Sequence, residues 1–126
     1  MERALEIYAA IHFFVIGLSH ALQPRAWVEF FLHLRQLGRS GVFVAGFMAL
    51  LFGSIIVAFH NVWSGLPMVL TLMGWAQVTK GLLYFVFPQI GERSMARVSY
   101  EREKEFVVPG ILFIALGALM LYLVLR

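Results

Sequence analysis

Four long apolar segments, separated by shorter polar connections, account for most of this 126-residue sequence. They cover residues 4–22, 41–59, 66–87 and 107–125. Each one approaches or exceeds the roughly 18 residues with which a helix crosses about 30 Å of hydrocarbon. Each is also apolar around its whole circumference rather than along one stripe. The pattern predicts an all-α integral membrane protein, a single domain built as a bundle of four transmembrane helices.

The first connection has a different pattern from the spans. Residues 24–37 begin with a proline and separate an apolar from a polar face, with Trp27, Phe31 and Leu34 opposite Glu29, His33 and Gln36. Such a helix lies in the membrane interface, where we expect Trp27 and Phe31 to act as anchors. Residues 60–65 predict a tight turn. Residues 88–106 form the one polar connection, and their mixed charges are expected to extend the last helix into water.

Basic residues indicate the orientation of the spans. They are concentrated in the first and third connections: Arg25, Arg35, Arg39, Arg93, Arg97, Arg102 and Lys104. The opposite side has only Arg3 and Arg126. The positive-inside rule therefore places both termini outside, in a pattern typical of a bacterial inner membrane with periplasmic ends. Glu2 and Glu6 lie where a signal peptide carries positive charge, so we expect the first segment to be retained as a span.

The two halves of the sequence resemble each other after a shift of 64 residues. The shift aligns Gly17 with Gly81, Pro24 with Pro88, Gly46 with Gly110 and Gly53 with Gly117. Such a repeat implies two helical hairpins of the same orientation, related by an axis along the membrane normal, as in transporters with parallel repeats. Glycine-rich membrane sequences also give such matches by chance, so the sequence leaves the repeat open.

Composition supports a membrane environment. Apolar residues make up 61% of the chain and charged residues 13%, compared with roughly 45–50% and about 25% in soluble domains. The net charge of +3 comes from residues scattered through short connections, so it indicates topology and not a nucleic-acid partner. The chain has no cysteine, which excludes a disulfide framework, a thiolate metal site and a cysteine nucleophile.

Five polar residues within the apolar segments are candidates for a ligand or ion path: His12, Ser19, Gln77, Lys80 and Tyr84. Polar side chains are costly inside hydrocarbon and often functional there. His12 and Gln77 are expected near the middle of the membrane, so a polar seam between the first and third spans would result. The structural alternative is that these two residues hydrogen-bond across helices, while Lys80 extends its ammonium to the headgroups.

The four histidines raise the question of a metal or a haem. No His-x-x-x-His or Glu-x-x-His spacing is present to hold a metal on one helical face, so we expect no metal site. Haem b binding needs two imidazoles at matched depth. Only His20 and His33 could satisfy this condition, and haem therefore stays a third hypothesis.

A compact polar turn at the predicted outer face contains His60, Asn61 and Trp63. Trp63 has the position of an interfacial anchor, and asparagine is typical of turns. The histidine at a helix end is typical of a cap. A small outward-facing binding site is the alternative interpretation.

Glycines form small-residue stripes on the second and fourth spans, at Gly46, Gly53, Gly110 and Gly117. Such stripes let helix backbones approach closely, either within one bundle or between chains. Four short spans make a thin bundle. We therefore favour partners in addition to the lipid bilayer, either copies of this chain or subunits of a larger membrane complex.

The sequence contains no P-loop, nucleophile elbow, His-Glu-x-x-His motif or arginine-rich voltage sensor, so we favour a non-enzymatic role. The four-span plan and the Gly-Leu-x5-Pro helix endings resemble small inner-membrane proteins of bacteria. Small four-helix drug exporters would require a glutamate inside the first span, whereas Glu6 lies at its outer edge. The leading hypothesis is an accessory or scaffold subunit, or a homo-oligomer, that acts through helix packing. A small transporter or channel is second, and a haem-binding redox subunit is third.

Overall fold

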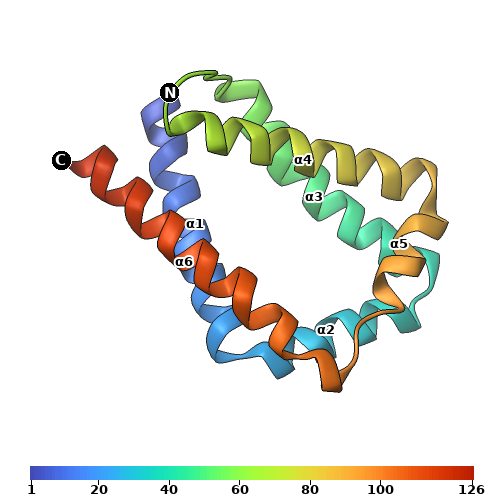
Figure 1. Cartoon of the computed structure of the whole chain (residues 1–126). Helices are drawn as coiled ribbons and strands as arrows, with labels where there is room; N and C mark the ends of the chain where they lie inside the picture. Colours follow the sequence, from blue (N-terminus) through green and yellow to red (C-terminus); the bar gives the residue numbers. More distant parts are fainter. The chain divides into compact units, whose positions relative to one another are not determined.

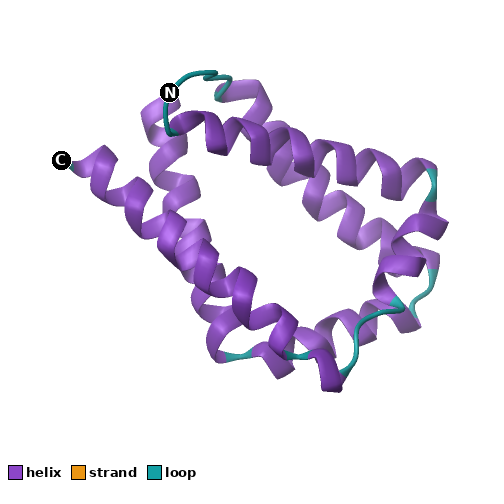
Figure 2. Cartoon of the chain, viewed as in Figure 1, coloured by secondary structure: helices purple, strands orange, loops and turns teal.

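The computed structural model describes all 126 residues and contains helices and connections but no strand. Figure 1 shows the helices in chain order, and Figure 2 shows how short the connections between them are. The helices are α1 (Glu2–Leu22), α2 (Pro24–Gln36), α3 (Arg39–Phe59), α4 (Pro67–Val86), α5 (Pro88–Met95), the 3-10 helix η1 (Tyr100–Arg102) and α6 (Lys104–Leu125). The all-α fold class predicted from the sequence is confirmed.

Four of these helices, α1, α3, α4 and α6, are long and apolar enough to cross a membrane. They coincide with the four apolar segments of the sequence. The largest difference is at the start of α6, which begins at Lys104 because the charged residues before the apolar segment continue the helix. The chain is therefore a multi-pass helical membrane protein.

Proline and glycine determine where several helices begin. Pro24, Pro67 and Pro88 each occupy the first position of a helix, where the missing N–H costs nothing because it would have no intrahelical partner. Gly38 lies between α2 and α3 with φ of 64°, a left-handed backbone conformation that favours glycine. Pro24, Gly38 and Pro88 thus separate the short helices α2 and α5 from the neighbouring spans.

The helices are grouped into two compact units. The first unit comprises Met1–Glu29 and Ser99–Arg126, and the second unit comprises Phe30–Val98. The long helices of the first unit are α1 and α6, and those of the second are α3 and α4. Each unit is thus built around one pair of candidate spans.

In the first unit, α1 and α6 are antiparallel and in very close contact. A Cβ atom added to Gly17 would lie 2.7 Å from the Gly110 carbonyl oxygen, and one added to Gly117 would lie 2.7 Å from that of Ala10. The ring of Phe13 is stacked on that of Phe113, with 5.6 Å between their centroids. Glycine is required at these positions because the two backbones touch.

In the second unit, α3 and α4 form the same kind of antiparallel pair. A Cβ atom on Gly53 would lie 2.7 Å from the Gly74 carbonyl oxygen, and one on Gly81 would lie 3.0 Å from that of Gly46. At one end of this pair lies a hydrophobic core made of side chains from α2, α3, α4 and α5: Leu34, Val42, Ala45, Tyr84 and Met95, with Phe31 packed against it. The predicted anchor Phe31 therefore contacts this core and is partly buried.

The sequence predicts only a polar connection where α5 lies. This helix has eight residues and is too short and too polar to give a recognisable apolar pattern. The Arg35 guanidinium holds its C-terminal end by donating to the Val98 carbonyl at 3.1 Å and to those of Met95 and Ala96 at 3.4 Å. The equivalence of Pro88 and Pro24 under the 64-residue shift was the signal that could have predicted α5 as a counterpart of α2.

The helix pairing differs from the hairpins that the repeat suggested. Those hairpins would each have combined two consecutive spans of one half. The structure instead pairs the first span with the fourth and the second with the third. The reason lies in the glycine faces, since Gly17 fits Gly110 and Gly81 fits Gly46.

Candidate functional site

The polar turn after α3 is organised around the hydroxyl of Thr71. His60 and Thr71 are both completely buried. The Thr71 hydroxyl donates to the Val62 carbonyl at 2.8 Å and accepts from the Val62 N–H at 3.1 Å. His60 Nδ1 lies 3.0 Å from the same oxygen. One side chain of α4 thus fixes both the backbone of the turn and the imidazole at its start.

These distances assign the proton of the His60 ring. The single hydroxyl proton of Thr71 points to the Val62 carbonyl, so the threonine oxygen can only accept from the imidazole. His60 Nδ1 therefore carries a hydrogen and donates it to Thr71. In the neutral ring, Nε2 is then the nitrogen that carries no hydrogen.

Asn61 and Trp63 form the exposed part of this turn. The indole N–H of Trp63 donates to the Asn61 side-chain oxygen at 3.0 Å, and Trp63 is 55% exposed. The pair presents an aromatic face and an amide to the surroundings. The Trp63 side chain is suited to a membrane interface, because its ring is apolar and its N–H has a hydrogen-bond partner.

A comparison with the first unit explains why the His60 network exists. Under the 64-residue shift, Thr71 and His60 correspond to Ile7 and Val124. The corresponding positions of the α1–α6 pair are therefore occupied by apolar residues. The difference is that α3 and α4 are joined at this end by residues 60–66, whereas α1 and α6 are far apart in the sequence. The network holds a connection that only the second unit possesses.

The proposed polar seam is divided between the two units. His12 and Ser19 belong to the first unit, whereas Gln77, Lys80 and Tyr84 belong to the second. Ser19 accepts a hydrogen bond from the indole N–H of Trp27 at 2.9 Å. Ser19 thus fastens α2 to α1, and the predicted anchor Trp27 packs on α1 through this hydrogen bond.

The seam residues of α4 have contacts within the second unit. Lys80 Nζ lies 5.4 Å from the centroid of the Tyr84 ring, one turn closer to the C-terminal end of the helix. Tyr84 is part of the hydrophobic core, and the Cβ of Gln77 faces Gly53. The direction of the Lys80 side chain is the one expected for an ammonium that extends to the headgroups.

His12 lies midway along α1 and is exposed, as Lys80 is on α4. Its ring centroid lies 5.8 Å from that of Tyr8. Both side chains line an open hollow of about 350 Å³ on the surface of α1. His12 is therefore the seam residue that best fits a ligand path.

The two histidines of the haem hypothesis lie in different units, His20 in the first and His33 in the second. His20 Nδ1 lies 2.8 Å from the Ile16 carbonyl oxygen, which can only accept, so Nδ1 carries the hydrogen. The His20 ring is stacked on Trp27 with 4.0 Å between centroids. His33 is exposed. Haem binding by this pair stays a prediction.

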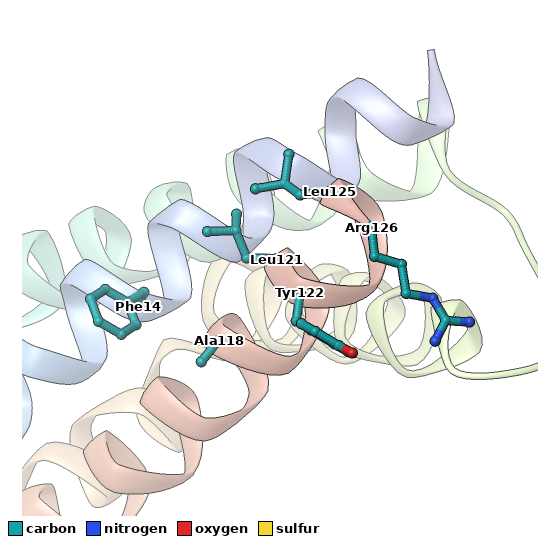
Figure 3. Close-up of a pocket in the computed structure, with 6 residues that line it drawn as sticks. All are labelled: Phe14, Ala118, Leu121, Tyr122, Leu125 and Arg126. Carbon is teal, nitrogen blue, oxygen red and sulfur yellow. The ribbon is translucent and has the colours of Figure 1, made fainter.

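Another open hollow, of about 520 Å³, lies between α1 and α6. Figure 3 shows its lining, in which Phe14 and three α6 side chains present only carbon, while the Tyr122 hydroxyl and the Arg126 guanidinium point away from Phe14. No group of three or more His, Cys, Asp or Glu side chains is positioned to hold a metal ion. This hollow is suited to acyl chains rather than to a polar substrate.

Thr71 and Arg35 were not among the site residues predicted from the sequence. Thr71 is a single hydroxyl near the start of a span, a position in which threonine is unremarkable. Arg35 was counted only as a topology signal, although it holds the end of α5. The signal for Thr71 was its place one turn into the helix that follows the His60 turn.

Comparisons of this chain with protein-family models, with curated proteins and with solved structures found no match. The fold and the site define the class of the protein. It is a four-span helical membrane protein whose spans form two glycine-packed antiparallel pairs.

Proposed function

We propose that this chain is a non-enzymatic accessory or scaffold subunit of a membrane assembly, which binds a transmembrane helix of its partner. The glycines Gly46, Gly53, Gly110 and Gly117 are buried within the chain's own helix pairs, so they offer no surface to a second protein. Partner binding then depends on the outward faces of the spans.

The observation that carries this proposal is an exposed stripe on α6. It consists of Val108, Leu112, Ala115, Leu119 and Tyr122, all of them exposed. Successive members are alternately four and three residues apart, which is the spacing through which two helices pack side by side. The small side chain of Ala115 at its centre permits a close approach. We call these residues the outer stripe of α6.

The experiment is purification of the tagged chain in mild detergent, followed by identification of the proteins that remain bound. Ala115→Phe would place a bulky ring at the centre of the outer stripe, and we expect at least a tenfold loss of the bound partner or second copy. Ala58→Phe, at an exposed position on α3, is the matched control and should retain it. The proposal is contradicted if the wild-type chain is isolated as a monomer with lipid alone, or if both variants retain the partner equally.

A small transporter or channel is a second candidate, favoured by the exposed His12 beside the hollow on α1. In proteoliposomes, His12→Leu and the double variant Gln77→Leu/Lys80→Leu should then abolish solute or proton flux without reducing assembly. Flux that is unchanged in both variants would remove this candidate.

We further propose that the membrane is a bacterial inner membrane and that both termini are periplasmic. Alkaline phosphatase, which is active only outside the cytoplasm, should be active when fused after Ser64 and inactive when fused after Ser99. A green fluorescent protein fusion should give the opposite result. The reverse pattern at both positions would invert the proposed topology.

A further inference from the structure

The six main helices fall into two sets of three that correspond along the chain. A shift of 64 residues carries α1 onto α4, α2 onto α5 and α3 onto α6. Pro24 and Pro88, the first residues of α2 and α5, coincide under this shift. Each half of the chain therefore consists of a span, an interfacial helix that begins with proline, and a second span.

The same shift also relates the contacts inside the two units, which sequence matching alone could not establish. A Cβ atom on Gly117 would meet the Ala10 oxygen at 2.7 Å and the Phe14 nitrogen at 2.8 Å. One on Gly53 would meet the Gly74 oxygen and the Val78 nitrogen, both at 2.7 Å. Gly117 lies 64 residues after Gly53 in the sequence, whereas Ala10 and Phe14 lie 64 residues before Gly74 and Val78. The same contact therefore occurs in both units, with α6 in the place of α3 and α1 in the place of α4.

The other end of each pair follows the same rule. Gly17 faces the Gly110 oxygen and Ile114, whereas Gly81 faces the Gly46 oxygen and Leu50. Gly110 faces the Cβ of His20 at 2.8 Å, and Gly46 faces the Cβ of Tyr84 at 3.0 Å. The contacts of all three glycine pairs thus correspond at one and the same offset. If the glycines matched only by chance, the residues that they contact would not also be 64 positions apart.

We infer that the chain consists of two copies of one three-helix segment, α1–α3 and α4–α6, fused in a single polypeptide. Each of these halves is the binding partner of the other. Both helix pairs combine one span from each half: α1 with α6, and α4 with α3. Neither half contains a complete pair. The surface that each half presents to its partner is the glycine face of its first span together with the glycine face of its last.

This pairing makes the connection between the halves dispensable for their association. Residues 60–65 join α3 to α4, and Asn61, Trp63, Ser64 and Gly65 are exposed there. Once the chain has folded, the halves are held together by the glycine faces of the spans. The hydrogen bonds of Thr71 with residues 60–62 and of Arg35 with the end of α5 add to these contacts. None of them requires an intact peptide bond between Trp63 and Ser64. This inference is independent of the proposed scaffold function, because it concerns only contacts within the chain.

The test uses the full chain with a protease site inserted between Trp63 and Ser64, folded first and cleaved afterwards in mild detergent. We expect the two pieces to elute as one species. The chain has no cysteine, so introduced cysteines report single contacts. Phe13→Cys/Phe113→Cys and Phe43→Cys/Phe85→Cys replace ring pairs whose centroids lie 5.6 Å and 5.4 Å apart. Cross-linked with a short thiol reagent, either pair should keep the pieces together in denaturing electrophoresis after cleavage.

Leu34→Cys/Val42→Cys is the control, because both residues lie in the hydrophobic core of the second unit and in the same half of the chain. Its cross-link should leave the cleaved pieces separate under denaturing conditions. Pieces that part on cleavage in mild detergent, or cross-links that do not span the two halves, would overturn the inference. If a cysteine variant fails to fold, co-elution or separation of the cleaved cysteine-free chain still decides between the two arrangements.

Discussion

Replacing Gly53 with valine is expected to separate α3 from α4. The added side chain would begin 2.7 Å from the backbone of Gly74 and Val78 on the neighbouring helix. A backbone cannot rotate away as a side chain can, so the two helices must move apart and lose their contacts. Overpacking of this kind costs about 1–3 kcal/mol, and more where no relaxation is available. We expect about 3 kcal/mol or more, measured as the shift in unfolding free energy in mixed detergent micelles.

The control for this substitution is Ala58→Val, on the exposed side of the same helix, which should change the unfolding free energy by no more than about 0.5 kcal/mol. Gly117→Val should behave like Gly53→Val, because its added side chain would meet the backbone of Ala10 and Phe14 at 2.7 and 2.8 Å. Equal stability of Gly53→Val and Ala58→Val would show that the helices do not pack through this face.

Replacing Thr71 with valine is expected to release the connection between α3 and α4. The substitution nearly preserves shape but removes the acceptor for the Val62 N–H and for His60 Nδ1, and the donor to the Val62 carbonyl. A buried polar group left without a partner costs about 1–3 kcal/mol. We therefore expect at least about 2 kcal/mol of destabilisation, together with faster proteolysis within residues 60–65.

Thr79→Val is the matched control, since it is the same substitution on the same helix. The Thr79 hydroxyl is exposed and donates only to the Trp75 carbonyl of its own helix at 2.9 Å, so its loss should have little effect. Thr71→Ser should restore most of the stability because it keeps the hydroxyl. If Thr71→Val and Thr79→Val were equally stable and equally resistant to protease, the assigned network would be wrong.

The spans could be predicted from the sequence because hydrophobicity acts locally. A run of apolar residues must be buried in lipid whatever its neighbours are, and α1, α3, α4 and α6 follow the four apolar segments closely. Helix α5 could not be found in this way, because eight largely polar residues give no such run. The end of α5 is fixed by Arg35. In the sequence, Arg35 is sixty residues from Met95, the nearest of its acceptors.

The pairing of the spans could not be predicted from the sequence, for a different reason. Any two glycine-bearing helices are compatible in composition, and the choice depends on which glycine faces coincide in register. The 64-residue shift was visible in the sequence, but it fits either of two pairings. Only the contacts of Gly17 with Gly110 and of Gly53 with Gly74 distinguish them.

The candidate site could be predicted only in part. His60, Asn61 and Trp63 were identified as a polar turn, whereas Thr71, which binds two of the turn's backbone atoms, was not. A hydroxyl becomes informative only when its partners are known, and here the His60 ring and the Thr71 hydroxyl lie eleven residues apart in the sequence. Similarly, the role of Ser19 as acceptor for the Trp27 indole N–H could not be predicted from the sequence, and its role in a seam stays a prediction.

The union of α1 with α6 has a consequence for how the protein is made. Chains emerge from the ribosome at about 5–20 residues per second, so α1 enters the membrane on the order of 10 s before the helix that covers its glycine face. The α3–α4 pair has no such delay, since its helices follow one another directly. The second unit can therefore mature while the ribosome is still at work, whereas α1 must wait in lipid as an unmatched surface. Until α6 arrives, the glycine face of α1 is open to lipid and to any other glycine face of the same shape.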